Sequence, residues 1–86
     1  MNTVELRKIL ENEGIKNIYY SLSESEPTPV EVVYCLREKE NEYEVFISER
    51  NKHEEVQRFD NESDACKALL TMMSQYHDKR LAKYLR

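Results

Sequence analysis

Residues 43–73, YEVFISERNKHEEVQRFDNESDACKALLTMM, decide the fold of this chain. Apolar and polar residues alternate over Tyr43–Glu49, which predicts a strand. A charged turn at residues 50–53 and a short strand over Glu54–Phe59 are expected to follow it. Asn61 is a favourable N-cap residue, and apolar residues then recur at helical spacing. The segment therefore predicts a β-hairpin that runs directly into a helix.

The N-terminal half predicts another helix and two more strands. Asn2 is placed to cap a helix over Thr3–Glu13, and Gly14 follows it at a position that favours positive φ. Alternating patterns predict strands at Asn17–Leu22 and Val30–Arg37, separated by a loop that contains two prolines. Each half thus supplies one helix and two strands.

The expected fold class is α+β, with the element order α-β-β-β-β-α in a single domain of residues 1–86. Short connections favour an antiparallel four-stranded meander covered by the N-terminal helix and a longer C-terminal helix. The pattern leaves open whether the last helix ends near Asp78 or continues to the C-terminus. A chain of this length buries somewhat over ~60% of its unfolded surface, which leaves little room for a deep active site.

Composition predicts a globular protein of the cytoplasm. Apolar residues make up 40% of the chain and charged residues 35%. We find no apolar run of transmembrane length and no secretory signal, so no membrane association is expected. The two cysteines, Cys35 and Cys66, fit a reducing compartment in which they serve as small buried side chains.

The cysteines and histidines do not form a catalytic or metal-binding pattern. Cys66 and His77 are eleven residues apart in one predicted helix, roughly 16 Å along its axis, which is beyond hydrogen-bond reach. Cys35, Cys66, His53 and His77 fall on separate elements without zinc-ligand spacing. We therefore expect no enzyme activity, no cofactor and no metal.

The net charge of −4 conceals an uneven distribution. Residues 1–64 contain 8 Lys and Arg against 16 Asp and Glu, whereas residues 65–86 contain 5 against 1. An acidic body disfavours nucleic acid and favours a basic protein partner. The basic end complements a helix C-terminus.

The second face of the predicted sheet is the candidate binding surface. We expect it to contain Tyr19, Ser21, Glu31, Val33, Cys35, Arg37, Glu44, Phe46, Ser48, Glu55 and Gln57. Aromatic anchors within a charged rim are typical of protein interfaces. Tyr19, Glu31, Val33, Glu44 and Phe46 are the predicted partner-binding residues. The alternative is that the first helix covers part of this face.

Segment 43–73 resembles the C-terminal half of small α+β immunity proteins from bacterial polymorphic toxin systems. These proteins often read YEVYYSERG-x-K, a short charged strand, and then F-D-S/N-E-x-x-A-C before an apolar helix. The matching residues are Tyr43, Glu44, Val45, Glu49, Arg50, Lys52, Phe59, Asp60, Glu62, Ala65 and Cys66. One departure is Asn51, where the family often has Gly; Asn51 also tolerates left-handed backbone.

The resemblance implies a cytosolic protein that binds a cognate toxin domain and neutralises it without catalysis. Many such toxins are basic nucleases, and an acidic antidote would meet them quickly. The alternative is a structural or regulatory domain that forms a homodimer through its sheet face or edge.

Overall fold

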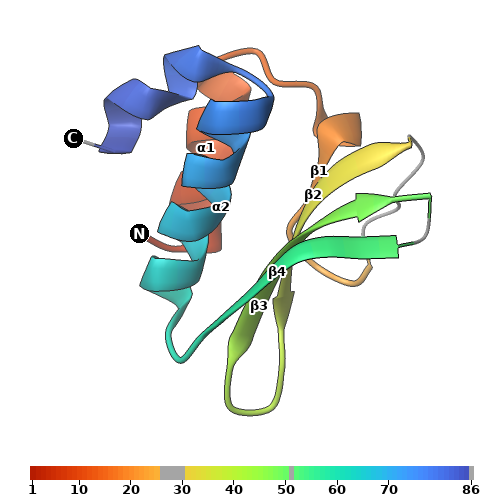
Figure 1. Ribbon diagram of the computed structural model, residues 1–86. Helices are drawn as coiled ribbons and strands as arrows, with labels where there is room; N and C mark the ends of the chain where they lie inside the picture. The colour runs from red at the N-terminus through yellow and green to blue at the C-terminus, as the bar shows by residue number, and fades with distance from the viewer. Residues whose placement is uncertain (26–30, 51, 86) are drawn as a thin grey trace.

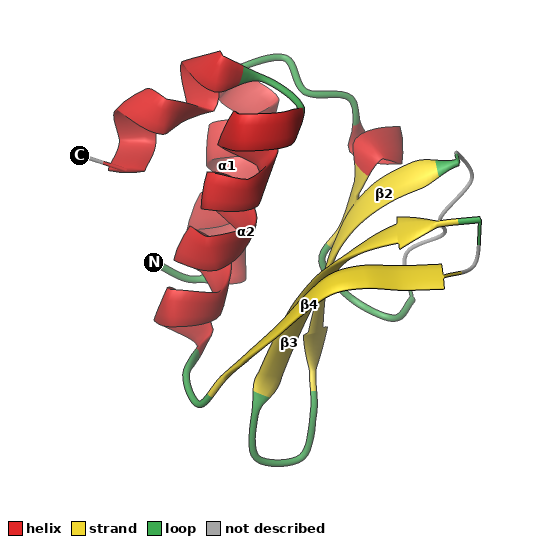
Figure 2. Ribbon diagram, in the orientation of Figure 1, coloured by secondary structure: helices red, strands yellow, loops and turns green. Residues whose placement is uncertain are grey.

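The computed structural model describes residues 1–25, 31–50 and 52–85. A four-stranded sheet forms one layer, and both α-helices lie on the same side of it (Figures 1 and 2). The order of strands in the sheet follows the chain, β1-β2-β3-β4. The predicted α+β class is confirmed, and neither α-helix covers the second face.

The first helix, α1 (Thr3–Asn12), forms where predicted. The backbone N–H of Glu5 donates to Oδ1 of Asn2, so Asn2 is its N-cap. Gly14 follows with φ of 73°, as expected of a residue after a helix end. Glu62 also accepts a hydrogen bond from the backbone N–H of Thr3, which joins the N-terminal ends of the two helices.

Three strands form the antiparallel part of the sheet: β2 (Val32–Glu38), β3 (Tyr43–Glu49) and β4 (Lys52–Phe59). The predicted hairpin is confirmed, with β4 starting two residues earlier than expected. The expected strand start at Val30, the prolines Pro27 and Pro29, and Asn51 lie outside the described residues. Left-handed backbone occurs beside Asn51, at Arg50, where φ is 50°.

The first predicted strand is wrong in length and direction. Asn17–Tyr19 forms the 3₁₀ turn η1, and only β1 (Tyr20–Ser21) pairs with β2. This pairing is parallel, with Tyr20 opposite Tyr34, so the sheet is mixed and not a wholly antiparallel meander. The Arg37 guanidinium fixes β1 in place by donating to the carbonyl and the hydroxyl of Ser21, at 3.1 and 2.9 Å.

A β-bulge interrupts β4 and reverses the predicted facing of its residues. Val45 pairs with Gln57 and Ile47 pairs with Glu54, so Glu55 and Val56 together oppose Phe46. Glu55 occupies left-handed backbone with φ of 56°. Because side chains alternate along a strand, the extra residue moves Gln57 to the helix side of the sheet. Gln57 and Glu55 are therefore not on the second face.

The C-terminal helix, α2 (Glu62–Tyr76), ends before Asp78 and is followed by the 3₁₀ helix η2 (Lys79–Leu85). Asn61 caps α2 by accepting a hydrogen bond from the Asp64 N–H at 2.8 Å. The apolar side of α2 packs over β2 and β3 and also contacts α1. Leu81 of η2 is buried in the same core.

Glu13 holds η2 against the end of α1. Its carboxylate accepts a hydrogen bond from the Tyr84 hydroxyl at 2.6 Å and pairs with the Lys83 ammonium at 3.0 Å. Its backbone carbonyl accepts a bond from Arg80, which also pairs with Asp78. Tyr84 and Lys83 hold the pKa of Glu13 below its usual range, so the carboxylate that makes these contacts is charged at neutral pH.

Candidate functional site

Three of the surface depressions in the described part of the chain are lined by both polar and aromatic side chains. The open-face depression lies on the sheet face opposite the helices. The tyrosine depression lies where α2 ends over the start of β2. The α2–β4 groove separates the second helix from the edge strand.

The open-face depression surrounds a small buried cluster of Val33, Cys35 and Phe46. Phe46 is only 3% exposed although it faces away from both helices. The His53 imidazole stacks on its ring, with 4.0 Å between centroids, and the Arg37 guanidinium lies 5.9 Å from the ring centroid. His53 and Arg37 thus form a polar lid over an apolar cluster.

Cys35 and His53 both line the open-face depression. Its other lining residues are Glu24, Arg37, Lys39, Glu44, Phe46 and Ser48. The two residues lie on β2 and β4, with β3 and its Phe46 between them. Strands two places apart are separated by roughly 10 Å, so the thiol and the imidazole are not within proton-transfer reach. The Cys35 thiol donates to the Val33 carbonyl at 3.7 Å.

Both thiols are buried, as predicted, and burial makes them poor nucleophiles. Burial raises the pKa of the Cys35 thiol, and it raises the pKa of Cys66 to about 11. Since the thiolate is the reactive form, neither cysteine is activated at neutral pH. Among the described residues, no group of three or more His, Cys, Asp or Glu side chains is arranged to hold a metal ion.

The tyrosine depression has a volume of about 460 Å³ and is lined by Tyr19, Glu31, Val32, Tyr34, Tyr76 and His77. The Tyr19 and His77 rings lie 4.8 Å apart, centroid to centroid, and Tyr34 meets His77 edge-on at 5.8 Å. Glu31 pairs with Arg50 at its rim, and both side chains of this ion pair are largely exposed. Tyr76 is 59% exposed.

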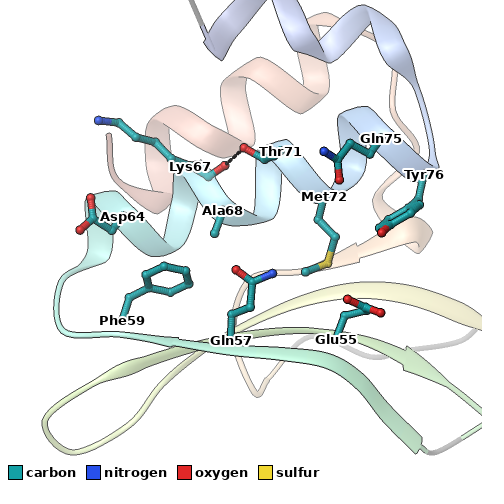
Figure 3. Close-up of a pocket in the computed structure, with 10 residues that line it drawn as sticks. All are labelled: Glu55, Gln57, Phe59, Asp64, Lys67, Ala68, Thr71, Met72, Gln75 and Tyr76. Atoms are coloured by element: carbon teal, nitrogen blue, oxygen red, sulfur yellow. Dashed lines mark hydrogen bonds between the residues drawn. The ribbon is translucent and has the colours of Figure 1, made fainter.

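The α2–β4 groove is the largest of the three, at about 480 Å³ (Figure 3). Glu55, Gln57 and Phe59 point from β4 toward α2, and Met72 points from the helix toward the sheet. Ala68 and Tyr76 add apolar surface, whereas Asp64, Lys67, Thr71 and Gln75 line the helix side. The groove combines an apolar floor with a polar and charged rim.

The structure separates the five predicted partner-binding residues. Val33 and Phe46 are buried in the open-face cluster, and Glu44 lies beside it in an ion pair with Arg58. Tyr19 is not on that face, because η1 turns it toward the main core and His77. Tyr19 and Glu31 come together in the tyrosine depression.

Tyr76 and His77 fall in the predicted C-terminal helix, but the helical pattern does not indicate that they line the tyrosine depression with Tyr19. The lid formed by His53 and Arg37 was also missed. The antiparallel register places His53 opposite Ser48 on the open face. A strand predicted to start at Glu54 instead of Lys52 left His53 in the turn and hid that position.

None of the described helices combines the length and the apolar character needed to cross a membrane. Comparisons with protein-family models, with curated proteins and with solved structures gave no match to this chain.

Proposed function

We propose that this protein binds the toxic domain of a bacterial polymorphic toxin and neutralises it by contact alone. The resemblance of segment 43–73 to immunity proteins motivates the toxin as partner. In the structure that segment contains β3, β4 and most of α2, and β4 and α2 line the α2–β4 groove.

The observation that carries the proposal is the exposed flank formed by β4 and the α2–β4 groove. Every residue from Lys52 to Arg58 is exposed, and the groove beside them has an apolar floor containing Phe59 and Met72. Apolar contact area inside a polar rim is the usual anatomy of a protein interface. The flank therefore offers a partner more accessible contact area than the open sheet face, whose aromatic ring is buried.

The acidic balance of residues 1–64, with 16 Asp and Glu against 8 Lys and Arg, supports a basic partner, although the flank itself also carries Lys52, Arg58 and Lys67. Glu49, Glu54 and Glu55 lie at the same end of the hairpin, where Glu49 is opposite Lys52 and Glu54 is opposite Ile47. Glu55 also lines the groove. Carboxylates at a rim steer a positively charged protein toward the surface and raise its association rate at low salt.

Self-association through β4 is the second candidate, because an exposed edge strand presents unpaired backbone groups to another copy. Sedimentation velocity over a wide concentration range tests self-association. A mass that rises with concentration supports the dimer, and a constant monomer argues against it.

The toxin proposal is tested by recovering the partner from cells that express the protein and producing its domains separately. One recovered domain must arrest growth when expressed alone, and co-expression of this protein must restore growth. A partner that is harmless, or one that this protein modifies covalently, contradicts the proposal.

Glu55→Lys tests the surface, with Glu11→Lys as the matched control. Both glutamates are exposed, but Glu11 lies on α1 away from the groove. We expect Glu55→Lys to slow association at low salt and the difference to shrink at high salt, since screening weakens exposed charges. Equal rates for both variants would argue against the α2–β4 flank.

A further inference from the structure

The tyrosine depression has the chemistry of a cation-binding site. Three phenol rings and one imidazole border it, from Tyr19, Tyr34, Tyr76 and His77. The faces of aromatic rings attract ammonium and guanidinium groups. Tyr34 is buried and belongs to the main core, so one wall is fixed, whereas Tyr76 is exposed and free to meet a ligand.

Electrostatics at this end of the molecule add to the attraction. Glu31 is the only charged group among the described residues that line the depression. The C-terminal end of α2 carries a partial negative charge, and the last turn of α2 contains no basic residue. Aromatic faces, a carboxylate and a helix C-terminus therefore favour a positive charge at the same place.

Among the described residues, Arg50 is the cation that pairs with Glu31, and their side chains are 78% and 60% exposed. An exposed pair of this kind contributes little to stability and exchanges readily with another partner. The depression that these rings line remains available to an incoming side chain, and Glu31 can share its second oxygen with it.

We propose that the tyrosine depression binds the guanidinium of an arginine side chain on a protein partner. Arginine is favoured over lysine because its planar group stacks on aromatic rings and is more weakly hydrated than an ammonium. The identity of the partner rests on the proposed function, but the chemistry of the site does not. Tyr76 lines both the tyrosine depression and the α2–β4 groove, so an arginine bound in the depression would lie next to the flank that we propose faces a basic toxin.

Titration with Nα-acetyl-arginine amide, followed by ¹H–¹⁵N NMR, tests the site. The control ligand is Nα-acetyl-citrulline amide, which has nearly the same shape without the charge. We expect arginine amide to bind about 5-fold more tightly than citrulline amide, as a partly exposed cation–π contact allows. The shifted resonances should centre on Tyr19, Tyr76 and His77.

Three variants separate the contribution of ring stacking from that of the Glu31 charge. Tyr76→Phe keeps an aromatic face and should retain the preference for arginine, whereas Tyr76→Leu should abolish most of it. Glu31→Gln should weaken arginine binding severalfold and leave citrulline binding unchanged. Tyr76 is mostly exposed, so these changes should not prevent folding.

Equal binding of the two ligands, or shifts that map elsewhere, would overturn the assignment. Failure of the toxin proposal gives a different result: arginine amide still binds at Tyr76, but no recovered partner is toxic. Conversely, a toxin whose affinity is unchanged by Tyr76→Leu leaves the proposed function intact and removes the arginine site.

Discussion

Truncation of Phe46 to alanine should lower the free energy of unfolding by about 3–5 kcal/mol, the usual cost of removing a buried aromatic ring. Phe46 packs with Val33 and Cys35 and lies beneath His53 and Arg37. A domain of 86 residues is stabilised by roughly 4–13 kcal/mol in total. The substitution therefore removes a large share of the stability, although Phe46 lies on the face that no α-helix covers.

Urea unfolding followed by far-UV circular dichroism measures this loss, since the chain contains no tryptophan. Val56→Ala is the control, because Val56 is 40% exposed and its truncation should change stability by less than about 0.5 kcal/mol. Phe46→Leu is measured if the alanine variant does not fold. Pairing Phe46→Leu with His53→Ala should reveal a coupling of about 0.5–1.5 kcal/mol. If Phe46→Ala lowers the free energy of unfolding no more than Val56→Ala does, the structural role of Phe46 is refuted. Phe46 would then again be a candidate for contact with a partner.

Three further predictions concern the N-cap of α2, the contacts of Glu13 with η2, and the Cys66 thiol. Asn61→Ala should destabilise the protein by about 1 kcal/mol in urea unfolding, because the first turn of α2 loses its cap, whereas Asn41→Ala in the exposed β2–β3 turn should have little effect. Glu13→Gln should lower the thermal midpoint at pH 7. The pKa of Glu13 is lower in the folded protein than in the unfolded chain, so the stability that its charge contributes is complete above the unfolded pKa of about 4.3 and is lost as pH falls. The thermal midpoints of the wild-type protein and of Glu13→Gln should therefore converge near pH 2. Cys66 should resist alkylation by iodoacetamide at pH 8 until urea unfolds the chain, because its pKa is about 11; rapid native labelling would contradict its burial.

The elements that were predicted well are those with local causes. Asn2 and Asn61 each accept the hydrogen bond expected of an N-cap, and the apolar stripe that follows each cap faces the core. The hairpin of β3 and β4 likewise follows from the alternating residues of β3 and the short charged turn after them. Caps, stripes and turns involve residues within a few positions of one another, so the sequence displays them directly.

The features that were missed depend on residues far apart in the chain. The parallel pairing of β1 depends on Arg37, which reaches Ser21 sixteen residues earlier. The burial of Phe46 depends on the register of β4, which places His53 on its ring. The tyrosine depression joins η1 to the end of α2. Packing between elements decides each of these features, and the local sequence pattern does not indicate them.

The left-handed residue in β4 also governs how far the sheet can grow. A strand arriving from a second molecule would need evenly phased donors and acceptors along the whole of β4. At Glu55 that phase is broken, so hydrogen bonding established on one side is out of step on the other. Only a few rungs can form before the mismatch, too few to seed a stack of molecules. The bulge thus limits strand addition along the longest strand of the sheet, all of whose residues from Lys52 to Arg58 are open to water.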